Sequence, residues 1–190
     1  MRVISGICRG RKLIPIEGSR IRPTSDRVKE AVFNILGPDI RGARVLDLFT
    51  GTGGLGIEAI SRGAGHVVFM DIDCRTAEKN LERCRLTQNA RLINIDLLSN
   101  SGFALLEKQT FDIVFIDPPY GNRYIEQVVI RPDFLSLLTE ETIILAEHGI
   151  KEKLDISPSY LHIARQKKYS KTMISILHKP RTGPNHDGKE

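Results

Sequence analysis

A glycine-rich loop between a short apolar segment and a helix constrains the fold of this chain more than any other feature. Residues 44–49 (Arg-Val-Leu-Asp-Leu-Phe) are predicted to form a strand, and the loop 50–56 (Thr-Gly-Thr-Gly-Gly-Leu-Gly) follows. Helical residues then extend through Ser61. A strand, a glycine loop and a helix in this order are typical of the β-α-β units of a parallel sheet.

The glycines of this loop have the spacing of a dinucleotide-binding motif. Gly51, Gly53 and Gly56 match G-x-G-x-x-G, and Asp71 follows Gly51 by 20 residues, at the end of the next predicted strand. Glycines allow a tight turn and a close approach of the backbone to a ligand, while the acid accepts hydrogen bonds from ribose hydroxyls. The motif alone does not distinguish a nicotinamide cofactor from another adenosine-containing cofactor.

A second informative segment is 111–120. Its residues 113–116 (Ile-Val-Phe-Ile) are typical of a strand that is buried on both faces of a parallel sheet. The strand ends at Asp117-Pro118-Pro119-Tyr120, because proline cannot donate to a sheet ladder and keeps the preceding residue extended. A carboxylate, rigid carbonyls and an aromatic ring therefore follow a strand end, where open α/β sheets bind ligands.

The remaining chain alternates strands and helices and contains no internal repeat. We expect a helix at 26–36 capped by Thr24 or Ser25, a second helix from Asp73 or Arg75 to Thr87, and a third around 101–108. Strands are expected at 67–70, 91–95 and 142–147. The stretch 124–138 is expected to be partly helical and interrupted at Pro132, and 161–169 and 171–177 to form an antiparallel hairpin. This order predicts a Rossmann-like α/β fold with a doubly wound, mostly parallel sheet and an antiparallel end.

The two ends of the chain are predicted to differ from the middle. Residues 1–24 are expected to form a basic β-hairpin and linker, 25–178 the main domain, and 179–190 a disordered tail rich in Pro, Gly and charge. In the helix at 26–36, Arg27 and Lys29 lie off the apolar stripe and are expected to extend the basic surface.

The net charge of +5 is unevenly distributed along the 190 residues. Residues 1–44 carry ten basic and four acidic side chains, 45–147 carry nine and fifteen, and 148–190 carry nine and four. Basic flanks around an acidic middle indicate that both ends of the chain meet a polyanion, with nucleic acid as the first candidate.

Composition excludes several other classes of protein. Apolar runs are shorter than the ~18 residues of a membrane span, and the N-terminus lacks the apolar core of a signal peptide. We therefore expect a cytoplasmic protein. No sequence feature indicates an oligomer, so a monomer is expected. Cys8, Cys74 and Cys84 form neither a C-x-x-C pair nor an even set, so we expect no disulfide framework and no metal site.

Two features favour a methyltransferase over a dehydrogenase. Asp47 precedes the first glycine by four residues, inside a strand that is usually apolar at this point in dehydrogenases. Methyltransferases that use S-adenosylmethionine place an acid there, close to the amino-acid end of the cofactor. The second feature is Asp117-Pro118-Pro119-Tyr120, which accompanies such loops and is absent from dehydrogenases.

Together these motifs resemble class I methyltransferases that modify exocyclic amines. The segments 9–13 (Arg-Gly-Arg-Lys-Leu) and 22–36 (Arg-Pro-Thr-Ser-Asp-Arg-Val-Lys-Glu-Ala-Val-Phe-Asn-Ile-Leu) narrow the resemblance to the RsmD family, the bacterial small-subunit (16S) ribosomal RNA guanine-N2 methyltransferases. The resemblance extends over nearly the whole chain except the tail. One departure is Asp71, where relatives usually carry Glu, although the shorter carboxylate can still accept ribose hydroxyls.

The resemblance implies a role for each motif. The catalytic residues would be Asp117, Pro118, Pro119 and Tyr120, which hold the target amine and stack on its base. S-adenosylmethionine would be bound by Asp47, Thr50, Gly51, Gly53, Gly56, Asp71, Ile72, Asp96 and Asp117. For Asp96, capping of the next helix is an equally good interpretation.

Basic residues on the N-terminal side are the predicted contacts to RNA phosphates, namely Arg9, Arg11, Lys12, Arg20, Arg22 and Arg27. Lys167, Lys168 and Lys171 in the closing hairpin are weaker candidates. Glu147, at the end of the fifth strand, is expected either to line the substrate side or to be paired structurally, and His148 is expected at the surface. The predicted partner is ribosomal RNA, within the small subunit or one of its assembly intermediates.

Three alternatives stay open on the sequence alone. An adenine-N6 methyltransferase acting on DNA or RNA also uses Asp-Pro-Pro-Tyr, although the DNA enzymes usually carry a separate recognition domain. An NAD-dependent oxidoreductase would share the glycine loop, but this chain offers no substrate domain for one. A basic RNA-binding module would not need Asp47, Asp71 and Asp117 together.

Overall fold

The computed structural model describes residues 1–16, 26–158 and 160–180. Within these ranges the elements, in chain order, are α1 (Asp26–Leu36), η1 (Gly37–Ile40), β1 (Arg44–Leu48), α2 (Gly54–Ser61), β2 (His66–Asp71), α3 (Arg75–Cys84), η2 (Thr87–Asn89), β3 (Ala90–Asn94), η3 (Ala104–Leu106), β4 (Phe111–Ile116), α4 (Tyr124–Val129), α5 (Pro132–Leu135), β5 (Leu138–Gly149), β6 (His162–Tyr169) and β7 (Thr172–His178), where η marks a 3-10 helix.

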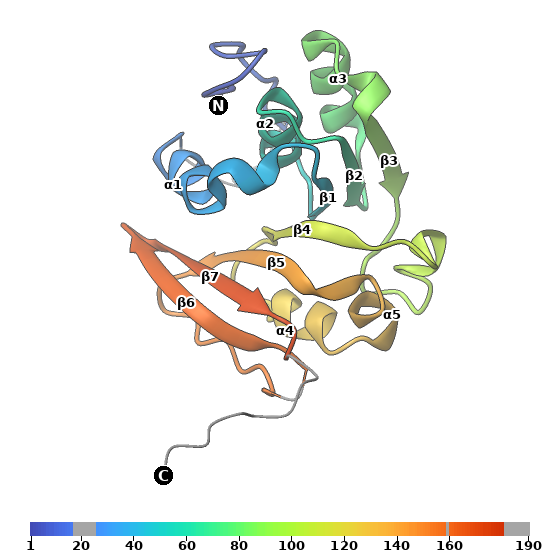
Figure 1. The fold of residues 1–190 in the computed structure, drawn as a ribbon, viewed down its shortest axis with the longest axis vertical. Helices are drawn as coiled ribbons and strands as arrows, with labels where there is room; N and C mark the ends of the chain where they lie inside the picture. The colour runs from blue at the N-terminus through green and yellow to red at the C-terminus, as the bar shows by residue number, and fades with distance from the viewer. Residues whose placement is uncertain (17–25, 159, 181–190) are drawn as a thin grey trace.

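The strands form one seven-stranded sheet in the order β3-β2-β1-β4-β5-β7-β6 (Figure 1). The neighbours from β3 to β5 are parallel, and β7 is antiparallel to both β5 and β6. The chain order reverses between β1 and β4, because β2 and β3 lie on one side of β1 while β4 and β5 lie on the other. Ligands bind at such a switch point, beyond the carboxyl ends of the strands.

Helices cover both faces of this sheet (Figure 1). On one face α1, α2 and α3 pack against alternate strand residues such as Val45, Val67 and Phe115. On the other face η3, α4 and α5 pack against the intervening residues, such as Leu46 and Val68. Because successive strand residues point to opposite faces, continuous apolar runs are needed to fill both layers. The predicted doubly wound sheet with an antiparallel end is confirmed.

Two predicted helices are corrected by the structure. The helix expected around 101–108 is only the 3-10 turn η3, because Gly102 lies in a tight turn where an added Cβ would come within 2.6 Å of the Leu97 carbonyl oxygen. The helix expected from Asp73 or Arg75 to Thr87 begins at Arg75 and already ends at Cys84, where Arg85 adopts a left-handed conformation with φ of 58°. The two helical pieces at 124–138 and the closing hairpin are as predicted.

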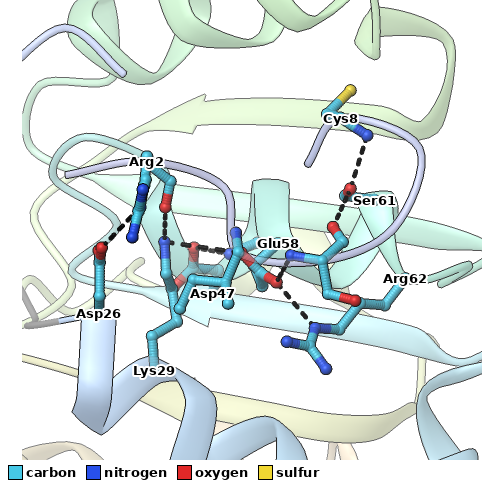
Figure 2. Close-up of polar contacts among 11 residues, drawn as sticks. Arg2, Cys8, Asp26, Lys29, Asp47, Glu58, Ser61 and Arg62 are labelled. Carbon is cyan, nitrogen blue, oxygen red and sulfur yellow. Dashed lines mark hydrogen bonds and ion pairs between the residues drawn. The ribbon is translucent and has the colours of Figure 1, made fainter. Parts of the chain in front are cut away.

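The predicted N-terminal hairpin is reduced to one antiparallel bridge, between Arg2 and Lys12. Its backbone hydrogen bonds are divided between pairing within the segment, such as Val3 N–H to the Arg11 carbonyl, and bonds to α2, where Glu58 and Ser61 hold the segment (Figure 2). The Glu58 carboxylate accepts the backbone N–H groups of Ile4 at 2.7 Å and Ser5 at 2.9 Å. Residues 1–16 are thus attached to the sheet layer through α2.

Lys29 does not extend the basic surface, contrary to the sequence-based expectation. Its side chain is fully buried and its ammonium lies 3.6 Å from the Glu58 carboxylate, which also pairs with Arg62 (Figure 2). Burial lowers the pKa of Lys29, and the neighbouring Glu58 opposes that shift. The apolar stripe of α1 does not reveal this role, because the partner lies on another helix.

His148 is likewise buried, contrary to the predicted surface position. It lies near the carboxyl end of β5, and its Nε2 is 2.8 Å from the Ser175 hydroxyl of β7. Burial lowers the pKa of this imidazole.

Several predictions lie outside the described residues: the caps Thr24 and Ser25, the basic residues Arg20 and Arg22, and the tail from 181 onward. In the described part of the chain, the helices are too short or too polar to cross a membrane. The same ranges contain no cluster of His, Cys, Asp and Glu arranged as metal ligands.

Candidate active site

A cavity of about 950 Å³ lies at the carboxyl ends of β1, β2, β4 and β5. Its wall includes the three strand-end acids Asp47, Asp71 and Asp117, together with Asp96 and Glu147. The volume lies within the ~300–1,000 Å³ range of small-molecule sites. The parallel sheet brings these acids together, because strands that are far apart in sequence end at the same edge.

Asp47 holds the two ends of the glycine loop together. Its Oδ2 accepts hydrogen bonds from the Thr50 hydroxyl and from the backbone N–H of Gly56, both at 2.9 Å. Burial raises the pKa of Asp47 to about 7, against the opposing effect of these two hydrogen bonds, and nearby Asp117 and Asp71 raise it further. Asp47 therefore shapes the loop as well as lining the cavity.

Every second residue from Phe49 to Gly53 has a positive φ angle. Phe49 has φ of 58°, Gly51 has φ of 53° and Gly53 has φ of 76°. A left-handed phenylalanine is rare and costs on the order of 1–3 kcal/mol, which makes the position a functional candidate. The Phe49 ring stacks on Tyr124, with ring centroids 5.7 Å apart and planes inclined by 14°. Both aromatic rings line the cavity.

Gly53 and Gly56 are buried behind the loop and serve its packing. A Cβ at Gly56 would lie 2.2 Å from the Phe69 ring and 2.9 Å from Asp47 Oδ2. A Cβ at Gly53 would lie 3.1 Å from Ile57 and 3.2 Å from Ala77. Of the predicted cofactor-binding residues, these two contact the core, and the others line the cavity.

Asp71 and Asp96 lie beyond the glycine loop. The Asp71 carboxylate accepts the backbone N–H of Gly51 at 2.9 Å, which joins the ends of β1 and β2. Asp96 Oδ1 accepts the backbone N–H of Leu98 at 2.9 Å, so this acid caps a turn and also lines the cavity. Ile72, which is 74% exposed, forms part of the same wall. Two carboxylates and an apolar side chain suit the polar ribose and the flat base of an adenosine.

The other side of the cavity is formed by Asp117, Pro118, Pro119 and Tyr120 after β4. The Tyr120 hydroxyl donates to Glu147 Oε1 at 2.9 Å and lies 3.1 Å from the Thr172 hydroxyl. Burial, together with the Glu147 carboxylate, raises the pKa of Tyr120 well above its usual range. The ring is therefore a neutral surface whose edge is fixed by β5 and β7.

Some lining residues were not predicted from the sequence. They come from the two ends of the chain: Met1, Pro15 and Ile16 from the N-terminal segment, and Tyr169, Ser170, Lys171 and Thr172 from the turn between β6 and β7. Asn80 of α3 positions the first group, since its amide bonds both the backbone of Ile14 and the Thr52 carbonyl. Asn80 is a polar residue next to the apolar stripe of Ala77 and Leu81, and this position in the sequence could have indicated its buried role.

The predicted RNA-binding residues have different surroundings. Arg9, Lys12 and Arg27 are exposed. The Arg11 guanidinium donates to the Arg83 carbonyl of α3, so it also anchors the N-terminal segment.

Known proteins resemble the chain over most of its length. A family model described as "Conserved hypothetical protein 95" matches residues 1–178. The chain belongs to this family. It is the RsmD family, so the membership predicted from the sequence motifs is confirmed.

Relatives in the RsmD family match this chain nearly end to end. The Bacillus subtilis (strain 168) protein YlbH, named provisionally as an rRNA methyltransferase, is 38% identical over 182 residues, covering 94% of this chain and 99% of its own. "Ribosomal RNA small subunit methyltransferase D" of Escherichia coli (strain K12) is 36% identical over 171 residues, which cover 88% of this chain and 84% of the relative. The solved structure of the Escherichia coli protein yhhF, described provisionally as a methyltransferase, superposes with a TM-score of 0.77 and 32% identity. The superposition covers 94% of this chain and 97% of yhhF.

Proposed function

We propose that this protein is an S-adenosylmethionine-dependent methyltransferase that methylates the exocyclic N2 of a guanine in small-subunit ribosomal RNA. The observation that carries the proposal is the placement of Asp117 and Tyr120 in the same cavity as the glycine loop and Asp71. One cavity can then accommodate an adenosine cofactor and an exocyclic amine. The name of the Escherichia coli relative supports small-subunit ribosomal RNA as the substrate.

The residues of the cavity fit S-adenosylmethionine. Asp71 and Asp96 offer acceptors for hydroxyl and amino groups, Ile72 offers an apolar surface, and Gly51 allows the backbone to approach a ligand. Asp47 lines the part of the cavity assigned to the methionine portion. When bound, this cofactor supplies a methyl group that the positive sulfonium activates for transfer.

Asp117 and the Pro118 carbonyl are the acceptors that orient the target amine. An exocyclic amine is a poor nucleophile, because its lone pair is delocalised into the ring. Two fixed acceptors favour the geometry in which that lone pair is available, and restricting the amine in this way lowers the barrier. As the new N–C bond forms, Asp117 takes up a proton that the nitrogen loses.

Tyr120 provides the surface on which the target base stacks. The residue is 46% exposed, while its hydroxyl is held by Glu147. Stacking of a base on an aromatic ring contributes ~1–3 kcal/mol. A base has to leave its helical stack to reach this cavity, so a loop or an otherwise accessible nucleotide is the favoured target.

RNA phosphates are expected to contact the exposed basic residues Arg9, Lys12 and Arg27, with Arg20 and Arg22 as further predicted contacts. Such contacts position the substrate and leave base recognition to the cavity. A substrate in the small ribosomal subunit or its assembly intermediate would be met in the cytoplasm, where the protein is proposed to act as a monomer.

Transfer of labelled methyl groups, followed by nucleoside analysis, tests the proposal. Small-subunit particles, naked ribosomal RNA and DNA are offered as substrates, and N2-methylguanosine is the expected product. N6-methyladenosine would instead support an adenine-N6 methyltransferase. Calorimetric titration with S-adenosylmethionine and with NAD checks the cofactor, because binding of NAD alone would contradict a methyltransferase.

Asp117→Ala should reduce methyl transfer to background while S-adenosylmethionine still binds in calorimetry. The physical reason is that this carboxylate contacts the amine side of the cavity, whereas Asp71 and the glycine loop hold the cofactor. Asp39→Ala, in the exposed turn η1 away from the cavity, is the matched control and should retain transfer. Loss of both transfer and cofactor binding in the Asp117 variant would assign this residue to the fold instead.

A further inference from the structure

Glu147 occupies the position next to Asp117 at the ligand-binding edge of the sheet. In the parallel pair of β4 and β5, Ile116 is in register with Ala146. The residues that follow are Asp117 and Glu147, so the two acids leave adjacent strands, whose typical separation is about 4.8 Å. Both line the same cavity, and both carboxylates raise the pKa of Tyr120.

The Glu147 carboxylate is held in a fixed position. Its Oε1 accepts the Tyr120 hydroxyl at 2.9 Å, and the Thr172 hydroxyl lies 3.1 Å from the same tyrosine oxygen. Because Tyr120 donates its proton to Glu147, Thr172 is the donor in the second bond. The side chain is buried, yet a carboxylate has acceptor capacity for several hydrogen bonds. Oε2 is covered in this structure, so Glu147 can support Tyr120 and also accept from a ligand once the carboxylate turns toward the cavity that it lines.

The exocyclic amines of nucleobases differ in the ring nitrogen next to them. In guanine, the amine N2 is adjacent to N1–H, a donor. In adenine and cytosine, the amine is adjacent to a ring nitrogen that is an acceptor. Asp117-Pro118-Pro119-Tyr120 recognises an amine and does not distinguish these cases. A second carboxylate beside Asp117 does distinguish them, since it attracts a donor and repels a lone pair.

We propose that Glu147 selects guanine by accepting a hydrogen bond from its N1–H while Asp117 holds the neighbouring N2 amine. This inference rests on the proposed function and adds the residue that determines the base. Thr172, at the start of β7, also lines the cavity, and its hydroxyl bonds the Tyr120 oxygen that contacts Glu147.

The test uses an analogue that keeps the amine and changes only the edge beside it. 2-Aminopurine carries the same 2-amino group as guanine, but its N1 is an acceptor and its O6 is missing. Two RNAs are compared, one with guanine and one with 2-aminopurine at the methylated position. The wild-type protein should prefer guanine in kcat/KM by roughly 10- to 100-fold, the effect of one charge-assisted hydrogen bond.

Glu147→Gln is the informative variant, because its amide can still accept the Tyr120 hydroxyl while its NH2 group donates to an acceptor at N1. The preference for guanine should fall to within a few-fold of unity. Tyr120→Phe is the comparison variant. It removes the hydroxyl that Glu147 supports and should slow transfer to both RNAs by a similar factor, leaving the preference in place. Calorimetric binding of S-adenosylmethionine checks that each variant is folded.

An unchanged preference in Glu147→Gln would overturn the inference, and so would equal loss of preference in Tyr120→Phe, because Glu147 would then act only as a support for the ring. A wild-type protein that accepts both RNAs equally would overturn it as well. Failure of the proposed function gives a different result: methyl groups appear as N6-methyladenosine, or no RNA is methylated although S-adenosylmethionine binds.

Discussion

At the scale of single residues, the buried carboxylates of this protein have separate tasks. Glu58 is fully buried and bonds two backbone N–H groups of the N-terminal segment as well as Lys29 and Arg62. A buried acid with this many partners holds chain segments together, and removing one partner of such a cluster is strongly destabilising. Asp47 ties the glycine loop, whereas Asp117, which is only partly buried, lines the cavity.

Asp47 should make the stability of the protein depend on pH. Its pKa of about 7 lies above the usual value of 3.8, so between these limits the folded state holds a proton that the unfolded chain has released. The stabilisation is therefore fully present below about pH 4 and is lost as the pH rises through 7. Relative to Asp47→Asn, the free energy of unfolding of the wild type should fall by up to about 4 kcal/mol over this range.

Urea unfolding of the cofactor-free protein at several pH values measures this effect. Asp39→Asn removes an exposed carboxylate far from the loop and controls for the change in net charge. Parallel pH profiles for the wild type and Asp47→Asn would contradict the assigned protonation.

How well single site residues could be predicted depends on what positions them. Asp47, Asp71 and Asp117 each follow an apolar run, and parallel strands bring their carboxyl ends together, so local patterns sufficed. Met1 and Thr172 reach the cavity only through contacts with distant elements. Such contacts leave no periodic signal in the sequence, which is also why the burial of Lys29 was missed.

At the scale of elements, the contact between α2 and β2 explains the third glycine of the loop. Gly56→Ala should destabilise the fold by about 1–3 kcal/mol or more, because its Cβ would lie 2.2 Å from the Phe69 ring, which is fixed in the core. Gly54→Ala is a matched control in the same helix. Its Cβ would lie 2.7 Å from the flexible end of Met1, which can move, and at an ordinary contact distance of 3.4 Å from the Thr52 hydroxyl.

Thermal unfolding of both variants measures the difference. Gly54→Ala should keep the melting temperature of the wild type and alter S-adenosylmethionine affinity, since Met1 lines the cavity. Equal melting temperatures for the two variants would show that Phe69 can move aside, contrary to the packing argument.

The elements that could be predicted are those with strong local signals. Every strand of the sheet was expected: the parallel strands from apolar runs that end at or near an acid, and the closing hairpin because no long helix separates its two segments. The stretch 101–108 was expected to be helical, but the turn at Gly102 leaves only η3. Similarly, the N-terminal segment has the apolar pattern of a hairpin, and its backbone bonds are shared between internal pairing and α2.

At the scale of the whole molecule, the two basic ends of the chain meet at one cavity. Residues 1–16 contribute Met1 and Ile16, and the hairpin of β6 and β7 contributes Lys171. The acidic middle supplies the carboxylates that line the interior of the same cavity. This division places positive charge where RNA phosphates would arrive and negative charge where the amine and the sulfonium would lie.

RNA binding should consequently weaken with salt, and two exposed residues of the N-terminal segment should account for part of the dependence. Each phosphate contact contributes roughly 0.7–0.9 to the slope of log K against log salt. Arg9→Ala with Lys12→Ala should therefore reduce the magnitude of that slope by roughly 1.4–1.8. Arg11 is left in place, because it bonds the Arg83 carbonyl and supports the segment.

The control is Lys79→Ala with Lys108→Ala, which removes the same charge from exposed positions in the acidic middle. Fluorescence anisotropy with a small-subunit RNA fragment, measured from low to physiological salt, gives both slopes. The control variant should keep the wild-type slope. If both double variants lowered the slope equally, net charge alone would explain the binding; only a loss confined to Arg9 and Lys12 assigns the RNA contact to the N-terminal segment.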